Sequence, residues 1–334
     1  MSNRAVEQQN FDEQDPFAGL ALVTKPVPKA EPGHVVVRIT LRPVNPTDLI
    51  SISSNRLRIP GVSSNRLRIP GSEGFGIVHE VGEGVTTVAK GQRVVPFFGR
   101  QRHTGEGSWQ QYVSLKQELV WPVPDSISDQ AAAQFVVNPW TLYGFLTDLK
   151  VPKGEYVLQT AAGSVLGRQL IQLAKHWGIK TINVVRRAEQ KEELKTLGAD
   201  EVISTDNEDV PTRVKEITGG KLAYGAVDAV AGTLTKQVTA SVRDGGQVFV
   251  YGVLAGYDAT VGVGDLFRGV RVAAWVLPNS LPERFEEYID KVSKLIEAKI
   301  IVPLVGETYD LADFQLAIKK STEVARGGKV FLTG

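Results

Sequence analysis

A turn of small residues is the first part of the sequence that could do chemistry. Residues 156–175, "YVLQTAAGSVLGRQLIQLAK", have the pattern of a strand, a tight turn and a helix. In the G-x-G-x-x-G frame of dinucleotide-binding turns, the small positions are Ala162, Ser164 and Gly167. Backbone N–H groups at the start of such a helix favour a pyrophosphate. Two of the three glycines are replaced, so a plain, closely packed αβ turn is the alternative, but the strand–turn–helix context favours a cofactor.

The end of the next predicted strand indicates which dinucleotide would bind. The strand 180–185 is followed by Arg186 and Arg187, where an NAD site usually has an acidic residue for the ribose hydroxyls. Guanidinium groups at this position suit the 2′-phosphate of NADP. The nearest acid, Glu189, falls in the next predicted helix. The pair therefore predicts NADPH as the cofactor, and two solvated arginines at a helix start are the alternative.

The composition excludes thiol chemistry and argues against a metal. The chain contains no cysteine, which rules out disulfides, thiolate nucleophiles and any zinc site that needs a cysteine ligand. The four histidines are scattered and form no H-x-x-x-H pair: His34, His79, His103 and His176. We therefore expect no metal site.

A ten-residue segment occurs twice in direct succession. Residues 52–61, "ISSNRLRIPG", are followed by "VSSNRLRIPG" at 62–71. The repeat contains four arginines: Arg56, Arg58, Arg66 and Arg68. Three interpretations stay open. The repeat is a duplication of a tolerant surface loop, or its arginines bind an anionic substrate tail such as the phosphates of a coenzyme A or carrier-protein thioester, or the arginines are solvated and the loop's shape alone selects the substrate.

Two kinds of element must position these residues. The first 130 residues have short apolar runs separated by Gly and Pro, which predicts strands of a small barrel. From Ser128, a candidate helix N-cap, strand-like and helix-like segments alternate, which predicts βαβ units and a parallel sheet. The predicted strands of that region are 155–161, 180–185, 200–205, 225–231, 246–252 and 270–276, and its helices are 164–178, 188–198, 209–220 and 281–299.

The bulk properties describe an ordinary globular protein of two domains. The chain has 334 residues, which is long for one domain, and a formal net charge of +1, which indicates neither nucleic acid nor a membrane surface as partner. No apolar run approaches the length of a membrane-spanning helix. The N-terminal residues lack the apolar core of a signal peptide and are too acidic for a typical transit peptide. We expect a cytoplasmic protein, or an organellar one only if a targeting segment is missing from this chain.

Taken together, the segments resemble the medium-chain dehydrogenase/reductase superfamily. The resemblance covers nearly the whole chain and rests on the cofactor turn, the ending "L-x-x-F-x-x-A…GGKVFL", "VNPTDL" (44–49), "PGSEGFGIVHEVGEGV" (70–85), "GQRVVP" (91–96), "GSWQQY" (107–112) and "VNPWTLYGFL" (137–146). It implies an α/β fold in which a Rossmann doubly wound parallel sheet is inserted in a GroES-like β-barrel domain. The implied boundaries give the GroES-like domain residues 1–128 and 279–334, and the NADP-binding Rossmann domain residues 129–278.

The resemblance also implies an activity. Without cysteine the chain is similar to the zinc-free reductases, first the 2-enoyl thioester reductases and then the quinone oxidoreductases. Both transfer hydride from NADPH to an electron-poor carbon–carbon double bond or to a quinone, while the protein orients the cofactor. The expected partner is a small-molecule substrate, an acyl thioester among the candidates. The alternative is an NADPH-binding protein with a sensor or structural role and little catalysis.

Further site residues follow from the resemblance. It places Asn45 and Thr141 at the nicotinamide end, Gly163, Ser164 and Val165 at the pyrophosphate, Tyr251 and Gly252 beside the ribose and nicotinamide, and Lys329 at the C-terminal side of the cleft. Simpler roles are open for three of them, because Asn45 could shape the turn before Pro46, Thr141 could bond back to its own helix, and Tyr251 could be a core residue. Glu73 is expected to be structural and buried with a partner.

One family residue is missing. The thioester reductases have a tyrosine shortly after the "NP-S/T-D" turn, where it is the usual candidate for organising the carbonyl or supplying a proton. The corresponding stretch of this chain, 45–74, contains no tyrosine and is occupied by the repeat. Ser53, Ser54, Ser63, Tyr112 and Tyr143 are candidate proton donors that the sequence does not rank.

The family also suggests an oligomeric state. Its members often dimerise by joining Rossmann sheets edge to edge. The segments 246–252 and 270–276 lie near that edge, and an open sheet edge needs to be covered. We expect a homodimer.

Overall fold

The computed structural model describes residues 2–53, 69–98, 106–277, 284–324 and 327–334. The chain divides into two compact units, one made of residues 1–137 and 303–334 and the other of residues 138–302. The boundaries expected from the sequence are 128/129 and 278/279. No helix in the described ranges is both long and apolar enough to cross a membrane.

The first unit is built on a mostly antiparallel sheet of seven described strands. These are β3 (His34–Pro43), β4 (Phe75–Val81), β5 (Arg93–Pro96), β6 (Tyr112–Lys116), β7 (Val120–Pro122), β14 (Val305–Asp310) and β15 (Lys329–Thr333). The order is β14-β15-β3-β4-β5-β7, and β6 pairs with β3. The C-terminal strand β15 pairs with β3 through Phe331 opposite Pro43, so both ends of the chain contribute to one sheet.

Smaller elements complete the first unit. They are β1 (Ser2–Gln8) and β2 (Leu20–Pro26), which form an antiparallel ribbon, the helices α1 (Pro46–Ser53), α2 (Asp129–Ala133) and α11 (Phe314–Thr322), and the short 3₁₀ turns Gln117–Leu119 and Leu311–Asp313. Val44, Trp109 and Phe314 belong to a buried cluster that joins the ribbon, α1, α11 and β15. This cluster gives the first unit a hydrophobic core that includes residues from both chain ends.

The second unit contains a six-stranded, entirely parallel sheet in its described part. Its strands are β8 (Tyr156–Gln159), β9 (Lys180–Val185), β10 (Glu201–Ser204), β11 (Ala223–Asp228), β12 (Val242–Val250) and β13 (Arg271–Ala274). The order is β10-β9-β8-β11-β12-β13. Successive connections run outward from β8 to one side and from β11 to the other, which is the doubly wound arrangement.

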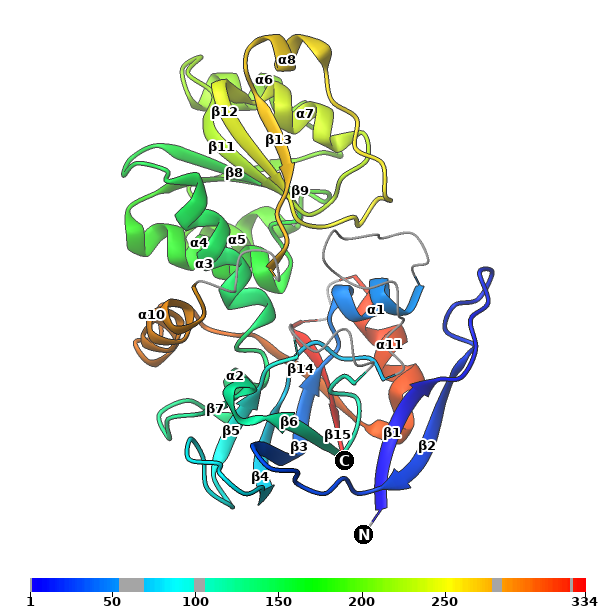
Figure 1. Ribbon diagram of the computed structural model, residues 1–334. Helices are drawn as coiled ribbons and strands as arrows, with labels where there is room; N and C mark the ends of the chain where they lie inside the picture. The colour runs from blue at the N-terminus through cyan, green and yellow to red at the C-terminus, as the bar shows by residue number, and fades with distance from the viewer. Residues whose placement is uncertain (1, 54–68, 99–105, 278–283, 325–326) are drawn as a thin grey trace. The chain divides into compact units, whose positions relative to one another are not determined.

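Helices cover both faces of this sheet (Figure 1). The helices of this unit are α3 (Val137–Leu149), α4 (Val165–Trp177), α5 (Gln190–Leu197), α6 (Val210–Ile217), α7 (Leu234–Ala240), α8 (Val263–Phe267) and α10 (Phe285–Glu297). On one face Ile171 of α4 and Leu194 of α5 belong to one buried cluster, and on the other Val214 of α6 and Val238 of α7 belong to a second. Central strands such as β9, which is buried without interruption from Thr181 to Val185, are enclosed because helices cover both faces.

The helical pattern that begins at Ser128 is interrupted. Ser128 caps α2 by accepting a hydrogen bond from the backbone N–H of Ala131, as the sequence predicts. The helix then stops at Ala133 and a new one begins at Val137. The carboxylate of Glu73 accepts the backbone N–H groups of Val136 and Val137 at the start of α3, so a residue far upstream in the sequence determines where this helix begins.

Helix α10 explains why the second unit continues beyond residue 278. The ring of Tyr288 packs edge-on against Trp140 and Tyr143 of α3, with ring centroids 5.5 Å and 5.3 Å apart. Arg284 pairs with Asp148 of α3 at 2.6 Å. The aromatic contacts and the ion pair place α10 with α3, and the compact unit therefore extends to Val302.

Candidate functional site

The parallel sheet changes its direction of winding at its centre. Strand β8 lies between β9 and β11, at the point where the direction of winding changes. In open parallel sheets, ligands bind at the carboxyl ends of the strands at this point. The residues that follow β8, β9, β11 and β12 are therefore the candidates for contact with a ligand.

The turn after β8 has the geometry of a helix N-terminus packed closely against its strand. Ser164 is the N-cap of α4, and its Oγ accepts the backbone N–H of Gly167 at 3.0 Å. A Cβ atom on Gly167 would lie 2.6 Å from the carbonyl oxygen of Ala162, so only glycine fits there without a shift. Ala161 has a positive φ of 51°, a conformation that costs a non-glycine residue about 1 kcal/mol or more. The predicted small positions thus lie together in one tight turn.

Arg168, which the sequence analysis missed, holds this turn from the helix side. Its Nε donates to the carbonyl oxygen of Gly163 at 3.1 Å, and its Nη1 pairs with Glu193 of α5 at 2.5 Å. The guanidinium therefore fixes the turn carbonyl and links α4 to α5. Its position directly after Gly167 was the available signal, but an arginine at that place predicts no particular partner.

A buried carboxylate organises the ends of β8 and β11. Asp228 is fully buried, and its carboxylate accepts hydrogen bonds from Oγ1 of Thr160 at 2.7 Å and Oγ1 of Thr235 at 2.8 Å. It also accepts the backbone N–H groups of Val230 and Ala231. These donors compensate the cost of burying the charge. They also stabilise the loop after β11, where Ala231 has a positive φ of 62°.

Arg186 and Arg187 follow β9 directly at the same end of the sheet. Arg186 is exposed and Arg187 half-buried, and neither forms an ion pair with any described residue. Their main chain is held in place, because the carbonyl oxygen of Arg186 accepts Oγ of Ser204 at 2.8 Å and the backbone N–H of Asp206 at 3.1 Å. Glu189 is exposed and precedes α5 without a side-chain cap bond. Two guanidinium groups without a carboxylate partner in the described ranges fit a phosphate better than a ribose hydroxyl.

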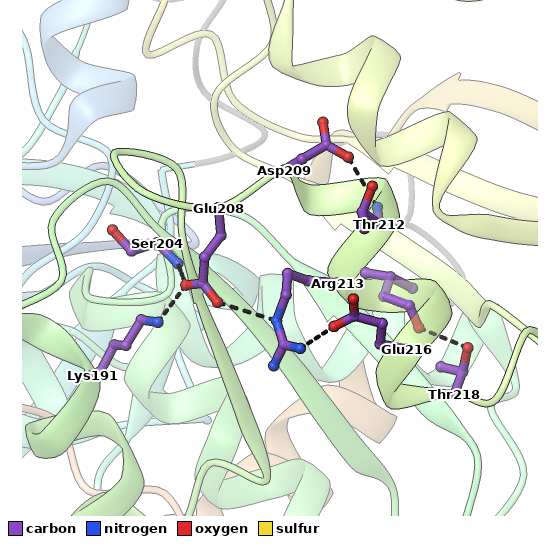
Figure 2. Close-up of polar contacts among 9 residues, drawn as sticks. Lys191, Ser204, Glu208, Asp209, Thr212, Arg213, Glu216 and Thr218 are labelled. Carbon is purple, nitrogen blue, oxygen red and sulfur yellow. Dashed lines mark hydrogen bonds and ion pairs between the residues drawn. The ribbon is translucent and has the colours of Figure 1, made fainter.

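Figure 2 shows a charged cluster that includes Ser204 at the end of β10 and Glu208 of the loop that follows. The carboxylate of Glu208 pairs with Lys191 of α5 and with Nε of Arg213 of α6, and it accepts the backbone N–H of Ser204 at 2.9 Å. Arg213 also pairs with Glu216 on its own helix. The cluster joins α5, α6 and the loop after β10, and the sequence analysis did not single it out.

Tyr251 and Gly252 follow β12 at the carboxyl end of the sheet. The hydroxyl of Tyr251 is buried and has no hydrogen-bond partner among the described residues, while its ring packs against Phe145 at 5.2 Å. Burial raises the pKa of Tyr251. A Cβ atom on Gly252 would lie 2.5 Å from the carbonyl oxygen of Ala229. An orphaned buried hydroxyl at this end of the sheet fits a site that a ligand's polar group completes.

The first unit contains its own buried polar network around Asn45. The Asn45 side chain donates to Glu73 at 3.0 Å and accepts from Nζ of Lys329 at 2.6 Å. Its backbone N–H donates to Asp48 at 2.9 Å. Burial raises the pKa of Glu73 to about 7, against the opposing effect of the Lys329 ammonium. Glu73 is therefore buried with partners, as expected, and the ammonium of Lys329 is directed to Asn45 within the same unit.

The remaining predicted residues have varied positions. Thr141 is a buried residue of α3. Oη of Tyr143 donates to Glu287 at 3.0 Å. Burial, together with this hydrogen bond, raises the pKa of Tyr143 to about 12. Tyr112 is half-buried on β6, and Ser53 ends α1. Residues 54–68 lie outside the described residues, and with them Arg56, Arg58, Arg66, Arg68, Ser54 and Ser63.

Two family models match the chain, one in each unit. Residues 31–125 match the alcohol dehydrogenase GroES-like domain, and residues 165–294 match the zinc-binding dehydrogenase domain. The residues present do not fit a zinc ion, because the chain has no cysteine and no three His, Asp or Glu side chains of its described part lie close enough together to hold a metal.

Relatives and solved structures agree with the family models. The chain is 30% identical over 309 residues to the mitochondrial enoyl-[acyl-carrier-protein] reductase of Dictyostelium discoideum, covering 89% of this chain and 85% of the relative. It is 30% identical to the mouse enzyme of the same name over 96% of this chain and 86% of that enzyme.

Two solved quinone oxidoreductases share the fold over the whole length. That of Pseudomonas syringae is 26% identical with a TM-score of 0.86, and all of both chains is covered. That of Escherichia coli, solved as a complex with NADPH, is 25% identical with a TM-score of 0.85, covering 99% of this chain and 100% of that one. A GroES-like unit, a doubly wound parallel sheet and relatives at this level of identity lead to one conclusion: the chain belongs to the medium-chain dehydrogenase/reductase superfamily of oxidoreductases.

Proposed function

We propose that this chain is an NADPH-dependent reductase that delivers hydride to an α,β-unsaturated carbonyl, an enoyl thioester or a quinone. The observation that carries the proposal is the pairing of two features at one end of the parallel sheet. A tight turn with Gly167 at its core opens α4, and Arg186 and Arg187 follow the neighbouring strand without a carboxylate partner in the described ranges. The relatives, named enoyl reductases and quinone oxidoreductases, support a reductase rather than the sensor or structural alternative.

The residues of the second unit fit the adenosine half of the cofactor. We assign the pyrophosphate to the turn Ala162–Val165 and the start of α4, where the helix dipole and free N–H groups favour negative charge. We assign the 2′-phosphate to Arg186 and Arg187. Gly252 and Tyr251, whose hydroxyl has no partner among the described residues, are assigned to the ribose and nicotinamide. Asn45, Thr141 and Lys329 stay predictions for the nicotinamide end.

The chemistry asks little of the protein beyond orientation. When bound, NADPH supplies the hydride. An electron-poor alkene carbon or a quinone accepts this hydride, and a proton then completes the reduced product. The first 111 residues contain no tyrosine, so the residue that is the usual candidate for organising the carbonyl or supplying a proton in the thioester reductases is absent from its segment. We propose that water supplies this proton, which suits quinones and activated alkenes best.

Fluorescence titration with NADPH and NADH tests the cofactor assignment. The wild type should bind NADPH more tightly than NADH, and Arg186→Ala/Arg187→Ala should lose that preference while keeping its NADH affinity. Equal wild-type affinities would remove the 2′-phosphate assignment. A turnover panel of quinones, enones and enoyl thioesters then tests catalysis, and binding of NADPH without consumption in any assay would favour the sensor alternative.

We also propose a homodimer formed through the free edge of β13. Among the described strands, β13 pairs only with β12, and the helix before it exposes Phe267 at 87% and Val263 at 65%. An unpaired edge next to exposed apolar side chains is typical of a surface that another chain covers. A twofold axis at this edge would pair each β13 with its copy.

We also propose a cytoplasmic location. The curated relatives are named as mitochondrial enzymes, which makes an organellar location the competing hypothesis. Fluorescence microscopy of the natural gene product, tagged at its C-terminus, distinguishes the two.

A further inference from the structure

We propose that Glu208 is a positioning residue that fixes the main chain of the Arg186–Arg187 turn and so sets the preference for NADPH over NADH. The inference rests on the proposed function, because it assumes that this turn binds the 2′-phosphate. Glu208 belongs to the neighbouring loop and reaches the turn only through other residues.

The loop after β10 is hydrogen-bonded directly to the Arg186–Arg187 turn. The carbonyl oxygen of Arg186 accepts Oγ of Ser204 at 2.8 Å and the backbone N–H of Asp206 at 3.1 Å. The backbone N–H of Thr205 donates to the carbonyl oxygen of Val185 at 3.0 Å. The loop after β10 therefore holds the main chain from which both arginine side chains project.

Glu208 stabilises the loop after β10 through two hydrogen bonds. Its carboxylate accepts the backbone N–H of Ser204 at 2.9 Å, and its own backbone N–H donates to the carbonyl oxygen of Ser204 at 2.9 Å. The loop is thus closed on Ser204, the last residue of β10, which is the same residue that bonds to Arg186. The side chain of Glu208 is only 19% exposed, so water competes weakly for these bonds.

The carboxylate of Glu208 forms ion pairs with residues of two helices. Lys191 of α5 and Arg213 of α6 approach it from opposite sides, as Figure 2 shows. Burial disfavours the charge, but the Lys191 and Ser204 donors and Arg213 outweigh it and hold the pKa of Glu208 below its ordinary value. Helix α5 begins directly after the arginine turn, so the ion pair with Lys191 fixes the turn's far end as well.

Positioning and simple electrostatics predict opposite results for Glu208→Gln. If the carboxylate mattered only as a negative charge near the phosphate, its removal would tighten NADPH binding. If it positions the arginines, its removal loosens the turn and weakens NADPH binding. NADH lacks the 2′-phosphate, so a loosened arginine turn leaves its affinity nearly unchanged.

The test compares Glu208→Gln with Glu216→Gln by measuring dissociation constants for NADPH and NADH. Glu216 also pairs with Arg213 and loses the same charge, but it is exposed and has no bond to Ser204 among the described residues. We expect Glu208→Gln to reduce the NADPH preference about tenfold through weaker NADPH binding, and Glu216→Gln to leave it unchanged. An unchanged or increased preference in Glu208→Gln would overturn the inference.

A second variant covers the case in which Glu208→Gln does not fold. Ser204→Ala removes the hydroxyl bond to Arg186 but keeps the backbone N–H that donates to Glu208. It should lower the NADPH preference in the same direction by a smaller factor, and a wild-type preference in this variant would equally contradict the inference. A wild type that does not prefer NADPH would instead contradict the proposed function.

Discussion

Nζ of Lys329 donates a hydrogen bond of 2.6 Å to Oδ1 of Asn45, although 284 residues separate the two in sequence. The side-chain amide of Asn45 in turn donates a hydrogen bond to Glu73 at 3.0 Å, and all three side chains are buried. The bond joins β15, at the C-terminal end, to the turn between β3 and α1. It therefore stabilises the first unit across its two separate chain segments.

Lys329→Met should destabilise the protein strongly. The substitution keeps the apolar stem but leaves the buried Oδ1 of Asn45 without this donor and removes a cation that lowers the pKa of Glu73. A buried acceptor left without its donor costs roughly 1–3 kcal/mol. Urea denaturation measures the loss. Lys319→Met is the matched control, since Lys319 is exposed on α11 and should stay within about 0.5 kcal/mol of wild type. Equal effects of the two substitutions would contradict the role of the network.

Stability should fall as the pH rises through the acidic and neutral range because of Glu73. Burial raises the pKa of Glu73 in the folded protein to about 7, while Lys329 lowers it and Asp48 raises it. An unfolded glutamate has a pKa of about 4.3, so between these values the folded state binds more protons than the unfolded state. The contribution is complete below about pH 4.3 and is lost as the pH rises through about 7, a decrease of about 4 kcal/mol.

The free energy of unfolding, measured from pH 5 to pH 8 for wild type and Glu73→Gln, checks this dependence. The variant lacks the titrating group, so the wild-type advantage should shrink as the pH rises and become constant above neutrality. A difference that does not change over this range would show that Glu73 is ionised throughout.

Much of the second unit could be predicted from the sequence because its signals are local. The predicted strand 180–185 coincides with β9, and the predicted helix 164–178 corresponds to α4 with its Ser164 cap. Hydrophobic periodicity and a capping residue identify such elements without knowledge of their neighbours. The ribbon strand β1 was missed, because its polar run "SNRAVEQ" becomes a strand only through pairing with β2.

The site was predictable only where spacing alone defines it. Ala162, Ser164 and Gly167 stand at motif positions, and they lie together in the turn. Asp228 and Glu208 were missed because their roles depend on partners brought by other elements, such as Thr160 from the end of β8 and Lys191 from α5. An acid that ends a buried strand, as Asp228 ends "GAVD", was the only available signal.

Asp228→Asn should weaken both the fold and cofactor binding. The carboxylate of Asp228 accepts hydrogen bonds from two threonine hydroxyls and two backbone N–H groups. The side-chain NH₂ of an asparagine would be a donor that faces these donors. We expect a loss of about 1–3 kcal/mol in the free energy of unfolding and weaker binding of NADPH and NADH alike. Denaturation and fluorescence titration measure the two effects. Asp244→Asn is the control, because Asp244 is 79% exposed and pairs only at the surface; an effect of similar size there would count against this explanation.

Gly167→Ala should damage the cofactor turn while leaving the sheet intact. The new Cβ would lie 2.6 Å from the carbonyl oxygen of Ala162, so the start of α4 must move away from the turn. Affinity for NADPH and NADH should fall at least about tenfold, because the N–H groups no longer converge on the pyrophosphate. Gly264→Ala, where a Cβ would meet no atom within 4 Å, should bind both cofactors like wild type. Wild-type affinity in Gly167→Ala would remove the turn from the site.

Phe267→Asp should convert the proposed dimer into a monomer. Phe267 is 87% exposed at the end of α8, close in sequence to the edge strand β13, and a charge at the centre of an apolar contact is strongly unfavourable on association. Sedimentation velocity should find a dimer for wild type and a monomer for the variant, with the far-ultraviolet circular dichroism unchanged. Leu316→Asp makes the same kind of change at a 56% exposed position of α11 in the other unit and should remain dimeric. A monomeric wild type, or a dimer that Leu316→Asp alone disrupts, would place the association surface away from β13.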